Sequence, residues 1–341
     1  MNEKSLDVLK QYDLRVDRVS RGRGGMILYT DKGIKLFLEC ERNDKYYERE
    51  DLITSMVSEN GFGRVDTYIR NSSNGLITSD EEGKRFVVKN WFDGRECNVR
   101  DIEDICTAVK TLANLHNVLS DVSEQILKQA AAEVLEPDNN KETEMRDTYA
   151  RHMKELKLTG NYLKSKKRKS EFEQTAYKNI GGFYREAAEA VKLLEASRFD
   201  ERFFDAKKTG ELCHGSYNYH NILFTGGAAA VTNFDRCKNE CQVSDLYQFM
   251  RKILEKYDWD TTTAYKMIDE YDKVKPINQT DLALLASLFA FPEKFWKVMN
   301  YYFNSSKAWI PPKTKEKLEK VVEQNDKRIK FVAGIAYTAR L

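Results

Sequence analysis

The sequence predicts a two-lobed α+β protein, with a small antiparallel β lobe followed by a larger helical lobe. Three observations predict this class. Short β-rich runs and turn signals fill about the first 90 residues, helical periodicity dominates from about residue 95, and 341 residues suit two lobes better than one. We place the β-rich lobe at 1–90, a connector at 91–95 and the helical lobe at 96–341.

The expected elements of the first lobe are short. Residues 1–11 have the pattern of a short helix, and a charged helical pattern covers 43–60. Asp31-Lys32-Gly33 between two apolar runs is a hairpin signal. The expected strands are runs rich in β-branched and aromatic residues: 16–19, 26–30, 34–40, 65–69, 76–79 and 85–90. Together they predict an antiparallel sheet with one inserted helix.

The second lobe is predicted to be helical around one β-containing segment. Asp101 can cap a helix whose apolar residues recur at helical spacing as far as His116. Residues 211–235 have the pattern of turns and short strands. The chain is expected to be helical again from about 243, with a break at Pro311-Pro312.

A basic run, KSKKRK at 164–169, lies in the long polar segment 130–200. It is either a solvated helix end or a docking patch for an acidic partner, and the sequence leaves both open.

The composition fits a folded protein and excludes several classes. Hydrophobic residues make up 41% of the chain and charged residues 32%, and the formal net charge is only +2. This balance gives no overall attraction to nucleic acid or to an anionic membrane, so we expect neither as a partner. The six cysteines form no CxxC pair, which favours reduced thiols over disulfides or a zinc site.

Two features bear on location. The first residues, MNEKSLDVLK, lack the apolar core of a signal peptide. The longest apolar run, 282–291, is about half as long as a membrane-spanning helix and stops at Pro292. We therefore expect a protein that is made in the cytosol and does not span a membrane.

A glycine-rich turn, RGRGG, lies between the first two expected strands. Its Gly22, Gly24 and Gly25 would let backbone N–H groups approach phosphates without obstruction by side chains. It is not a Walker loop, because neither GKS nor GKT follows and no helix opens behind it. Glycines in hairpin turns are mostly conformational, so the turn alone leaves both interpretations open.

A second constellation lies at 212–235. The sequence LCHGSYNYHNILF is followed by a Gly-Gly turn and then by AVTNFD, so two short strands separate a His-Gly loop from a loop that ends in a carboxylate. Such strands hold a catalytic loop beside a metal-binding loop. There Asn221 and Asp235 can share Mg²⁺ ions with nucleotide phosphates.

These residues resemble the aminoglycoside phosphotransferase and choline kinase branch of the protein-kinase-like fold. More closely, the chain is similar to spore coat proteins of the CotS type over nearly its whole length. The segments that carry the resemblance are WFDGREC at 91–97, LANLH at 112–116, HGSYNYHNIL at 214–223, the block 234–260, FPEKFWK at 291–297 and KAWIPPK at 307–313. The glycine turn is not specific.

The resemblance implies a catalytic loop and a metal loop, and in each loop an expected Asp is replaced by another residue. The branch has His-Gly-Asp in the catalytic loop, where the Asp orients or deprotonates the acceptor hydroxyl, whereas this chain has Ser216. The metal loop of the branch begins with Asp, whereas this chain has Asn233. A serine hydroxyl is not a carboxylate base, and a neutral amide holds Mg²⁺ less strongly than a carboxylate does. Asn221 remains as a catalytic and metal-binding candidate, and Asn233 and Asp235 complete the candidate metal ligands.

The resemblance also implies a phosphate-anchoring lysine on the third strand. Lys35 is the candidate, although Leu38 takes that position in another register. The ion-pair partner of the lysine would be Glu48 or Glu50 on the following helix. Trp91 at the connector is a further nucleotide-binding candidate.

The histidines and late aromatic residues are expected to be mainly structural. His214 should pack in the core, with Asp245 at the start of the next helix anchoring its loop, and His116 should also be packed. His220 lies in the loop, where a phosphate contact is the alternative. The aromatic residues at 291–302 fit one buried helix face, and the alternative is an acceptor pocket lined by Tyr301, Tyr302, Phe303 and Trp309.

Three functions remain open at this point. The favoured one is a spore coat protein that has become a pseudokinase, made in the mother-cell cytoplasm and built into the coat through contacts with other coat proteins. The second is a working phosphotransferase with unusual catalytic residues. The third is a regulator in which bound ATP holds the lobes closed. Ser216 and Asn233 favour a protein that is not an enzyme, and ATP with Mg²⁺ are the cofactors that the fold implies.

Overall fold

The computed structural model describes residues 3–22, 24–128, 145–305 and 311–341, and the chain divides into two compact units. The first unit consists of 1–139, 206–249 and 270–275, and the second of 140–205, 250–269 and 276–341. The first unit contains the β-rich lobe together with the predicted catalytic and metal loops. The candidate site therefore lies within one unit, and the predicted lobe boundary at 91–95 stays a prediction.

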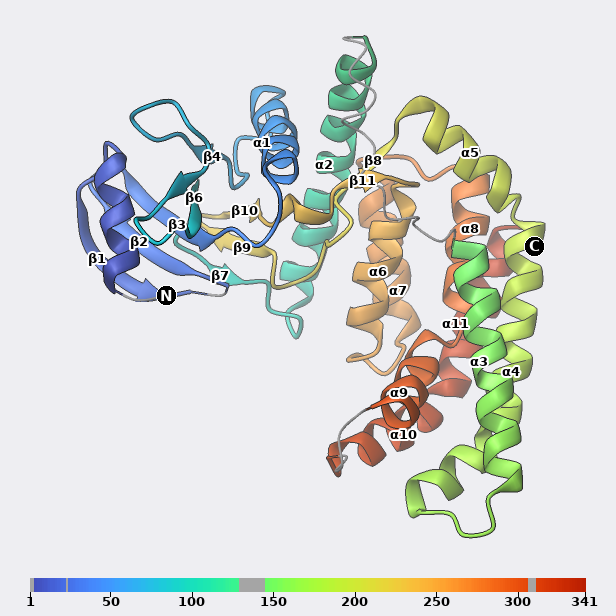
Figure 1. The fold of residues 1–341 in the computed structure, drawn as a ribbon. Helices are drawn as coiled ribbons and strands as arrows, with labels where there is room; N and C mark the ends of the chain where they lie inside the picture. The colour runs from blue at the N-terminus through green and yellow to red at the C-terminus, as the bar shows by residue number, and fades with distance from the viewer. Residues whose placement is uncertain (1–2, 23, 129–144, 306–310) are drawn as a thin grey trace. The chain divides into compact units, whose positions relative to one another are not determined.

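A six-stranded antiparallel sheet forms the β-rich lobe (Figure 1). Its order is β1-β2-β3-β6-β4, and β5 also pairs with β6. The strands are β1 (Val16–Arg21), β2 (Met26–Thr30), β3 (Gly33–Glu39), β4 (Tyr68–Ile69), β5 (Thr78–Ser79) and β6 (Arg85–Asn90). The predicted hairpin is present, since Thr30 pairs with Gly33. The strand expected at 65–69 is shorter, because Val65 leaves the sheet to form a parallel bridge with Val231.

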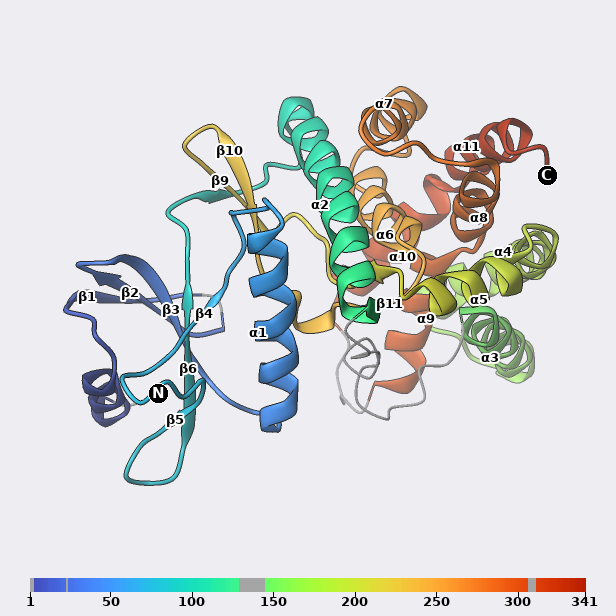
Figure 2. The same cartoon turned by 90° about the horizontal axis from the view of Figure 1, so that it is seen from above.

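Different helices cover the two faces of this sheet (Figure 2). The helices of the first unit are η1 (Glu3–Gln11, a 3₁₀ helix), α1 (Asp44–Glu59), α2 (Ile102–Lys128) and the beginning of α6 (Val243–Leu254). η1 packs on the face that carries Phe37 and Phe86. Leu38 and Val87 lie on the opposite face, where they pack with Tyr47 of α1. Neighbouring side chains of β3 and β6 therefore point to opposite faces, as the alternation of a strand requires.

Short strands frame the two predicted loops of the first unit. They are β7 (Arg95–Glu96), β8 (Leu212–Cys213), β9 (Ile222–Thr225), β10 (Ala228–Val231) and β11 (Lys238–Asn239). β9 lies between β7 and β10, and β8 pairs with β11. A single 3₁₀ turn, η3 (Phe234–Arg236), follows β10. The strands expected around the Gly226-Gly227 turn are thus confirmed.

The second unit is helical in its described residues. Its helices are α3 (Met145–Ser165), α4 (Glu171–Ala196), α5 (Phe199–Thr209), α7 (Thr261–Asp272), α8 (Gln279–Ala290), α9 (Glu293–Asn304), α10 (Lys313–Glu323) and α11 (Asn325–Thr338), with the ends of α5 and α7 in the first unit. α3 and α4 pack side by side as a hairpin (Figure 1). No helix in the part of the chain that is described has the length and apolar character needed to cross a bilayer.

Aromatic residues of α9 stack on the α3–α4 hairpin. The ring centroids of Trp296 and His152 lie 3.3 Å apart, and those of Phe295 and Phe183 lie 3.8 Å apart. Tyr302 stacks on Phe172 at 3.8 Å. These contacts confirm that the late aromatic face is core packing. Trp309, named for the alternative acceptor pocket, lies outside the described residues.

Candidate nucleotide and metal site

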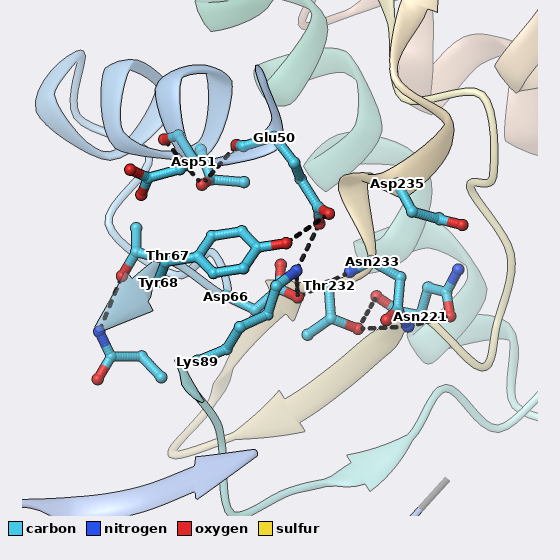
Figure 3. A network of polar contacts seen from close by, with 12 residues as sticks. Glu50, Asp51, Asp66, Thr67, Tyr68, Lys89, Asn221, Thr232, Asn233 and Asp235 are labelled. Atoms are coloured by element: carbon cyan, nitrogen blue, oxygen red, sulfur yellow. Dashed lines mark hydrogen bonds and ion pairs between the residues drawn. The ribbon is translucent and has the colours of Figure 1, made fainter. Parts of the chain in front are cut away.

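A buried lysine joins three elements of the first unit (Figure 3). The Lys89 ammonium on β6 forms ion pairs with Glu50 of α1 and with Asp66, which precedes β4. The exposed fractions of the three side chains are only 3%, 5% and 0%. The Tyr68 hydroxyl donates to Glu50 Oε2 at 2.7 Å, and the Tyr68 ring centroid lies 4.4 Å from the ammonium. These residues form a closed cluster, here called the Lys89 triad after its three charged members.

The predicted pairing of Lys35 with Glu50 is wrong. Lys35 Nζ donates instead to Asn90 Oδ1 at 2.8 Å. Lys35 shares a face of β3 with Phe37, whereas α1 covers the other face, so its side chain points away from Glu50. The alternative register, with Leu38 on the α1 side, is the one that occurs.

Neither Lys89 nor Asp66 is predicted from the sequence, because neither stands in a recognisable motif. The available signal was the alternation of side chains along β6, which places Val87 and Lys89 on the same face. A lysine on the face that α1 covers must find a carboxylate there, because a buried ammonium without a partner is costly.

The Lys89 triad holds two carboxylates against one ammonium, which strongly affects their protonation. Burial raises the pKa of Asp66 from 3.8 to about 6, although Lys89 opposes the shift. Asp66 Oδ1 is buried and has no hydrogen-bond partner in the described residues. Burial alone would lower the pKa of Lys89, but Asp66 and Glu50 raise it above its ordinary value. The lysine therefore stays charged, and the pKa of Asp66 is raised toward neutrality.

We predict that Asp66 makes stability depend on pH. Its folded pKa, about 6, exceeds its unfolded value of 3.8, so the folded protein holds the proton more tightly. The stabilising contribution is complete below about pH 4 and is lost as pH rises through 6. The free energy of unfolding of the wild type, relative to Asp66→Asn, should fall by up to about 3 kcal/mol between pH 4 and 7. Urea titrations of both proteins, with Glu48→Gln as an exposed control, measure this difference; a difference independent of pH would contradict the assignment.

Asp245 of α6 fixes the backbone of the His214 loop. Its carboxylate is fully buried and accepts hydrogen bonds from the N–H of His214 at 2.6 Å and of Gly215 at 2.9 Å. His116 Nε2 lies 3.2 Å from the same carboxylate. The contact expected of Asp245 is therefore confirmed, as is the packed position of His116.

The His214 ring is held in one tautomer. The Ser216 N–H donates to His214 Nδ1 at 3.1 Å, so Nε2 carries the proton and donates to the Thr232 carbonyl at 3.2 Å. Burial also lowers the pKa of His214, which keeps the ring neutral. Both ring nitrogens are occupied by backbone groups, and the ring therefore joins the two loops rather than serving as a base.

Replacement of Asp245 by Ala should destabilise the first unit. The change leaves the N–H groups of His214 and Gly215 buried without their acceptor, at a cost of roughly 1–3 kcal/mol in the free energy of unfolding. Chemical denaturation measures the effect, and Glu48→Ala on the exposed side of α1 is the control. Equal stability of the Asp245→Ala protein and the wild type would show that the carboxylate does not anchor the loop.

Asn221 and Asn233 are joined directly by their side-chain amides. Asn233 Nδ2 donates to Asn221 Oδ1 at 2.8 Å. Asn221 Nδ2 donates in turn to the Ser216 carbonyl at 2.9 Å. Because a carbonyl oxygen only accepts, this bond fixes the orientation of the Asn221 amide and turns its oxygen toward Asn233. The oxygen that would ligate Mg²⁺ thus already accepts a hydrogen bond from the residue that replaces the expected carboxylate.

The backbone of Asn233 connects this amide pair to the Lys89 triad. Its N–H donates to Asp66 Oδ2 at 3.1 Å (Figure 3). Asn233 adopts a left-handed conformation, with φ 65° and ψ 66°, which asparagine tolerates better than most residues. The metal loop is therefore held by groups of the protein itself.

Asp235, the remaining carboxylate of the metal loop, is exposed and points away from Lys89 (Figure 3). Its backbone carbonyl accepts a hydrogen bond from the Tyr46 hydroxyl of α1 at 2.9 Å. Among the residues that the structure describes, no three His, Cys, Asp or Glu side chains are grouped to hold a metal ion. The groups near Asn221 therefore fit Mg²⁺ poorly, because an amide N–H points at the candidate ligand oxygen.

The glycine turn, Trp91 and His220 were the other candidates for nucleotide binding, and each has a structural contact or constraint of its own. Gly24 has a positive φ of 80°, and a side chain at Gly25 would place its Cβ 2.4 Å from the Phe37 carbonyl oxygen. Trp91 is half-buried, and its backbone N–H donates to the Ile34 carbonyl at 3.0 Å. His220 contacts Glu96 through Nδ1. A nucleotide role for Gly22, Gly24, Gly25 or Trp91, and a phosphate contact by His220, remain predictions.

Known proteins share this fold and this family. Residues 5–335 match the family model described as spore coat putative kinase YutH. The chain belongs to this family. Its resemblance to spore coat proteins with a kinase-like fold is thereby confirmed over nearly the whole chain.

Solved structures confirm the fold class. An aminoglycoside phosphotransferase from Alicyclobacillus acidocaldarius is 18% identical with a TM-score of 0.84, covering 98% of this chain and 96% of that chain. A spectinomycin phosphotransferase in complex with ADP and spectinomycin is 12% identical, with a TM-score of 0.63 and coverage of 100% and 98%. A choline kinase from Cryptosporidium parvum is 11% identical, with a TM-score of 0.50 and coverage of 97% and 96%. At these identities the similarity shows the fold alone.

Proposed function

We propose that this member of the spore coat family is a pseudokinase that acts in coat assembly through protein contacts. The observation that carries the first part is the hydrogen bond from Asn233 Nδ2 to Asn221 Oδ1. Phosphotransfer on this fold needs a metal held between the catalytic and metal loops. Here a neutral donor lies between the loops, and the two loops bind each other without a metal.

Two further features support the same proposal. Ser216 offers no general base, and its N–H and carbonyl already serve His214 and Asn221. Lys89, the lysine that pairs with Glu50, is neutralised by two carboxylates and is 3% exposed, so a phosphate would have to displace Asp66 or Glu50 to reach it. A general base is therefore missing at Ser216, the ligand oxygen of Asn221 is already hydrogen-bonded, and Lys89 is not free to bind a phosphate.

The family description supports the second part of the proposal. The chain matches a family described as spore coat putative kinase YutH, and the words spore coat favour a place in the coat after synthesis in the mother-cell cytoplasm. A protein without phosphotransfer activity would contribute to such a shell through its surface. Detection of the protein in coat extracts of spores, and not in extracts of decoated spores, tests this placement.

We expect ATP with Mg²⁺ to stabilise the protein by less than about 1 kcal/mol at millimolar ATP, whereas a ligand at 100 times its Kd would add about 2.7 kcal/mol. The physical reason is the blocked oxygen of Asn221. Thermal denaturation with ATP, with ATP and Mg²⁺, and with Mg²⁺ alone provides the measurement. ATP turnover by the wild type that is abolished in Asn221→Ala would instead establish the working phosphotransferase.

We further expect Asn233→Asp to make stability depend on Mg²⁺. The substitution replaces the amide donor by a carboxylate oxygen opposite Asn221 Oδ1, so the variant should lose roughly 1–3 kcal/mol without metal. Millimolar Mg²⁺ should restore part of this loss, because two oxygens at this position form a metal ligand pair. Asn233→Ala is the matched control, since it removes the donor without supplying a ligand. Equal responses of the two variants to Mg²⁺ would show that the loops no longer form a metal site.

With Ser216→Asp added to Asn233→Asp, slow Mg²⁺-dependent hydrolysis of ATP is the expected gain, because a general base contributes about 10²–10⁴-fold. Addition of Asn221→Ala to the double variant should abolish that hydrolysis. Hydrolysis that survives this third change would arise from another site and would contradict the argument from the two loops.

A further inference from the structure

The nearly balanced charge of the chain conceals one strongly basic segment. Between residues 145 and 170, nine Lys and Arg stand against two Asp and Glu, which gives +7 in a chain whose net charge is +2. All other residues together therefore carry −5. This segment is α3 and the turn that leads into α4, in the second unit.

Five of these cations are exposed on α3 and the turn that follows it, and together they are here called the basic face. Its members are Lys154, Lys157, Lys164, Lys167 and Arg168. The three lysines of α3 are separated by three and seven residues, which places them on one side of the helix. The other two lie in the turn that follows α3. In the described part of the chain, none of the five side chains forms an ion pair or a hydrogen bond.

The other two cations of the KSKKRK run serve the fold of the turn. Lys166 pairs with the buried Glu173 at 2.6 Å, and Glu173 also accepts from the N–H of Ser170 in a capping box. Lys169 Nζ donates to the Lys166 carbonyl at 2.6 Å. Two cations of the run therefore stabilise the turn, and the remaining ones are exposed and have no partner among the described residues.

We propose that the basic face binds an acidic polypeptide segment of another coat protein. The partner class rests on the proposed role in coat assembly, whereas the charge of the partner follows from the basic face itself. The row from Lys154 to Lys164 extends about 15 Å along the helix, a length that matches a few turns of an acidic helix or a short extended segment. Leu158, which is 67% exposed beside the row, offers one apolar contact to such a segment.

The surroundings of the basic face favour a polypeptide over nucleic acid or membrane. Binding to nucleic acid depends on contacts with many phosphates over an extended positive surface. The residues outside this segment together carry −5, so they offer no such extension. A membrane-surface helix needs a free apolar side, whereas the apolar side of α3 packs against α4 and α9.

Fluorescence anisotropy with a labelled poly-Glu peptide of about 10 residues, the number that spans about 15 Å as a helix, tests the proposal on the full chain. The test variant carries Lys157→Gln, Lys164→Gln and Lys167→Gln. The matched control removes the same charge at three exposed lysines elsewhere, as Lys45→Gln, Lys266→Gln and Lys330→Gln. The Kd of the test variant should rise at least about tenfold and that of the control less than about twofold, since each exposed charge pair contributes up to about 1 kcal/mol.

Three results would overturn the proposal. The first is a wild type that does not bind poly-Glu, and the second is a control variant that loses as much affinity as the test variant. The third is tighter binding of the wild type to single-stranded RNA or to phosphatidylserine vesicles than to poly-Glu, which would replace the partner class. None of these results touches the amide pair, because none of the three lysines belongs to the candidate site. ATP turnover by the wild type, conversely, would overturn the pseudokinase and leave the peptide measurement unchanged.

Discussion

One buried positive charge holds the candidate site together. Lys89 pairs with Glu50 of α1 and with Asp66, and Asp66 in turn accepts the N–H of Asn233 in the metal loop. A helix, a strand and a loop from distant parts of the sequence are thus fixed by a single ammonium. Removal of the Lys89 charge should cost roughly 3–5 kcal/mol, because the two buried carboxylates would be left uncompensated. The position of the metal loop therefore depends on an interaction that lies entirely inside the protein.

The charges of this cluster support the proposal of a protein that does not transfer phosphate. In the proposed function, Lys89 has a structural role, because it holds α1 and the metal loop together through Glu50 and Asp66. Its two carboxylates keep it charged and occupied, so little of its charge is available to a phosphate. The fold of the phosphotransferases is retained, and groups of the chain itself make the connections that a nucleotide and a metal would otherwise make.

Local signals predicted most of the fold but not the lysine of the site. The boundaries of β2, β6 and α1 agree with turn residues and periodicity to within a residue or so, since those signals act over a few neighbours. Asp245 was predictable because it stands at the start of the apolar helix that follows the His214 loop, a position from which the related fold anchors that loop. Lys35 and Lys89 look alike in sequence, however, and only the packing of α1 on one face of the sheet decides between them. Asp66 had no local signal at all, because its partners come from β6 and the metal loop.

The replacement at Asn233 and the composition of the Lys89 triad are best understood together. With Asp66 and Glu50 ionised, the triad has one more negative than positive charge, and Asp66 lies within hydrogen-bond distance of the Asn233 backbone. A carboxylate at position 233 would add a second excess negative charge opposite the oxygen of Asn221. In a phosphotransferase a divalent metal neutralises such a group. Without the metal, a neutral amide is the side chain that both avoids this repulsion and donates to Asn221. Asn221 Nδ2 also donates to Ser216 Oγ at 3.3 Å, so the side chains at both replaced positions contact the Asn221 amide. In the proposed function, these contacts take the place of a cation between the two loops.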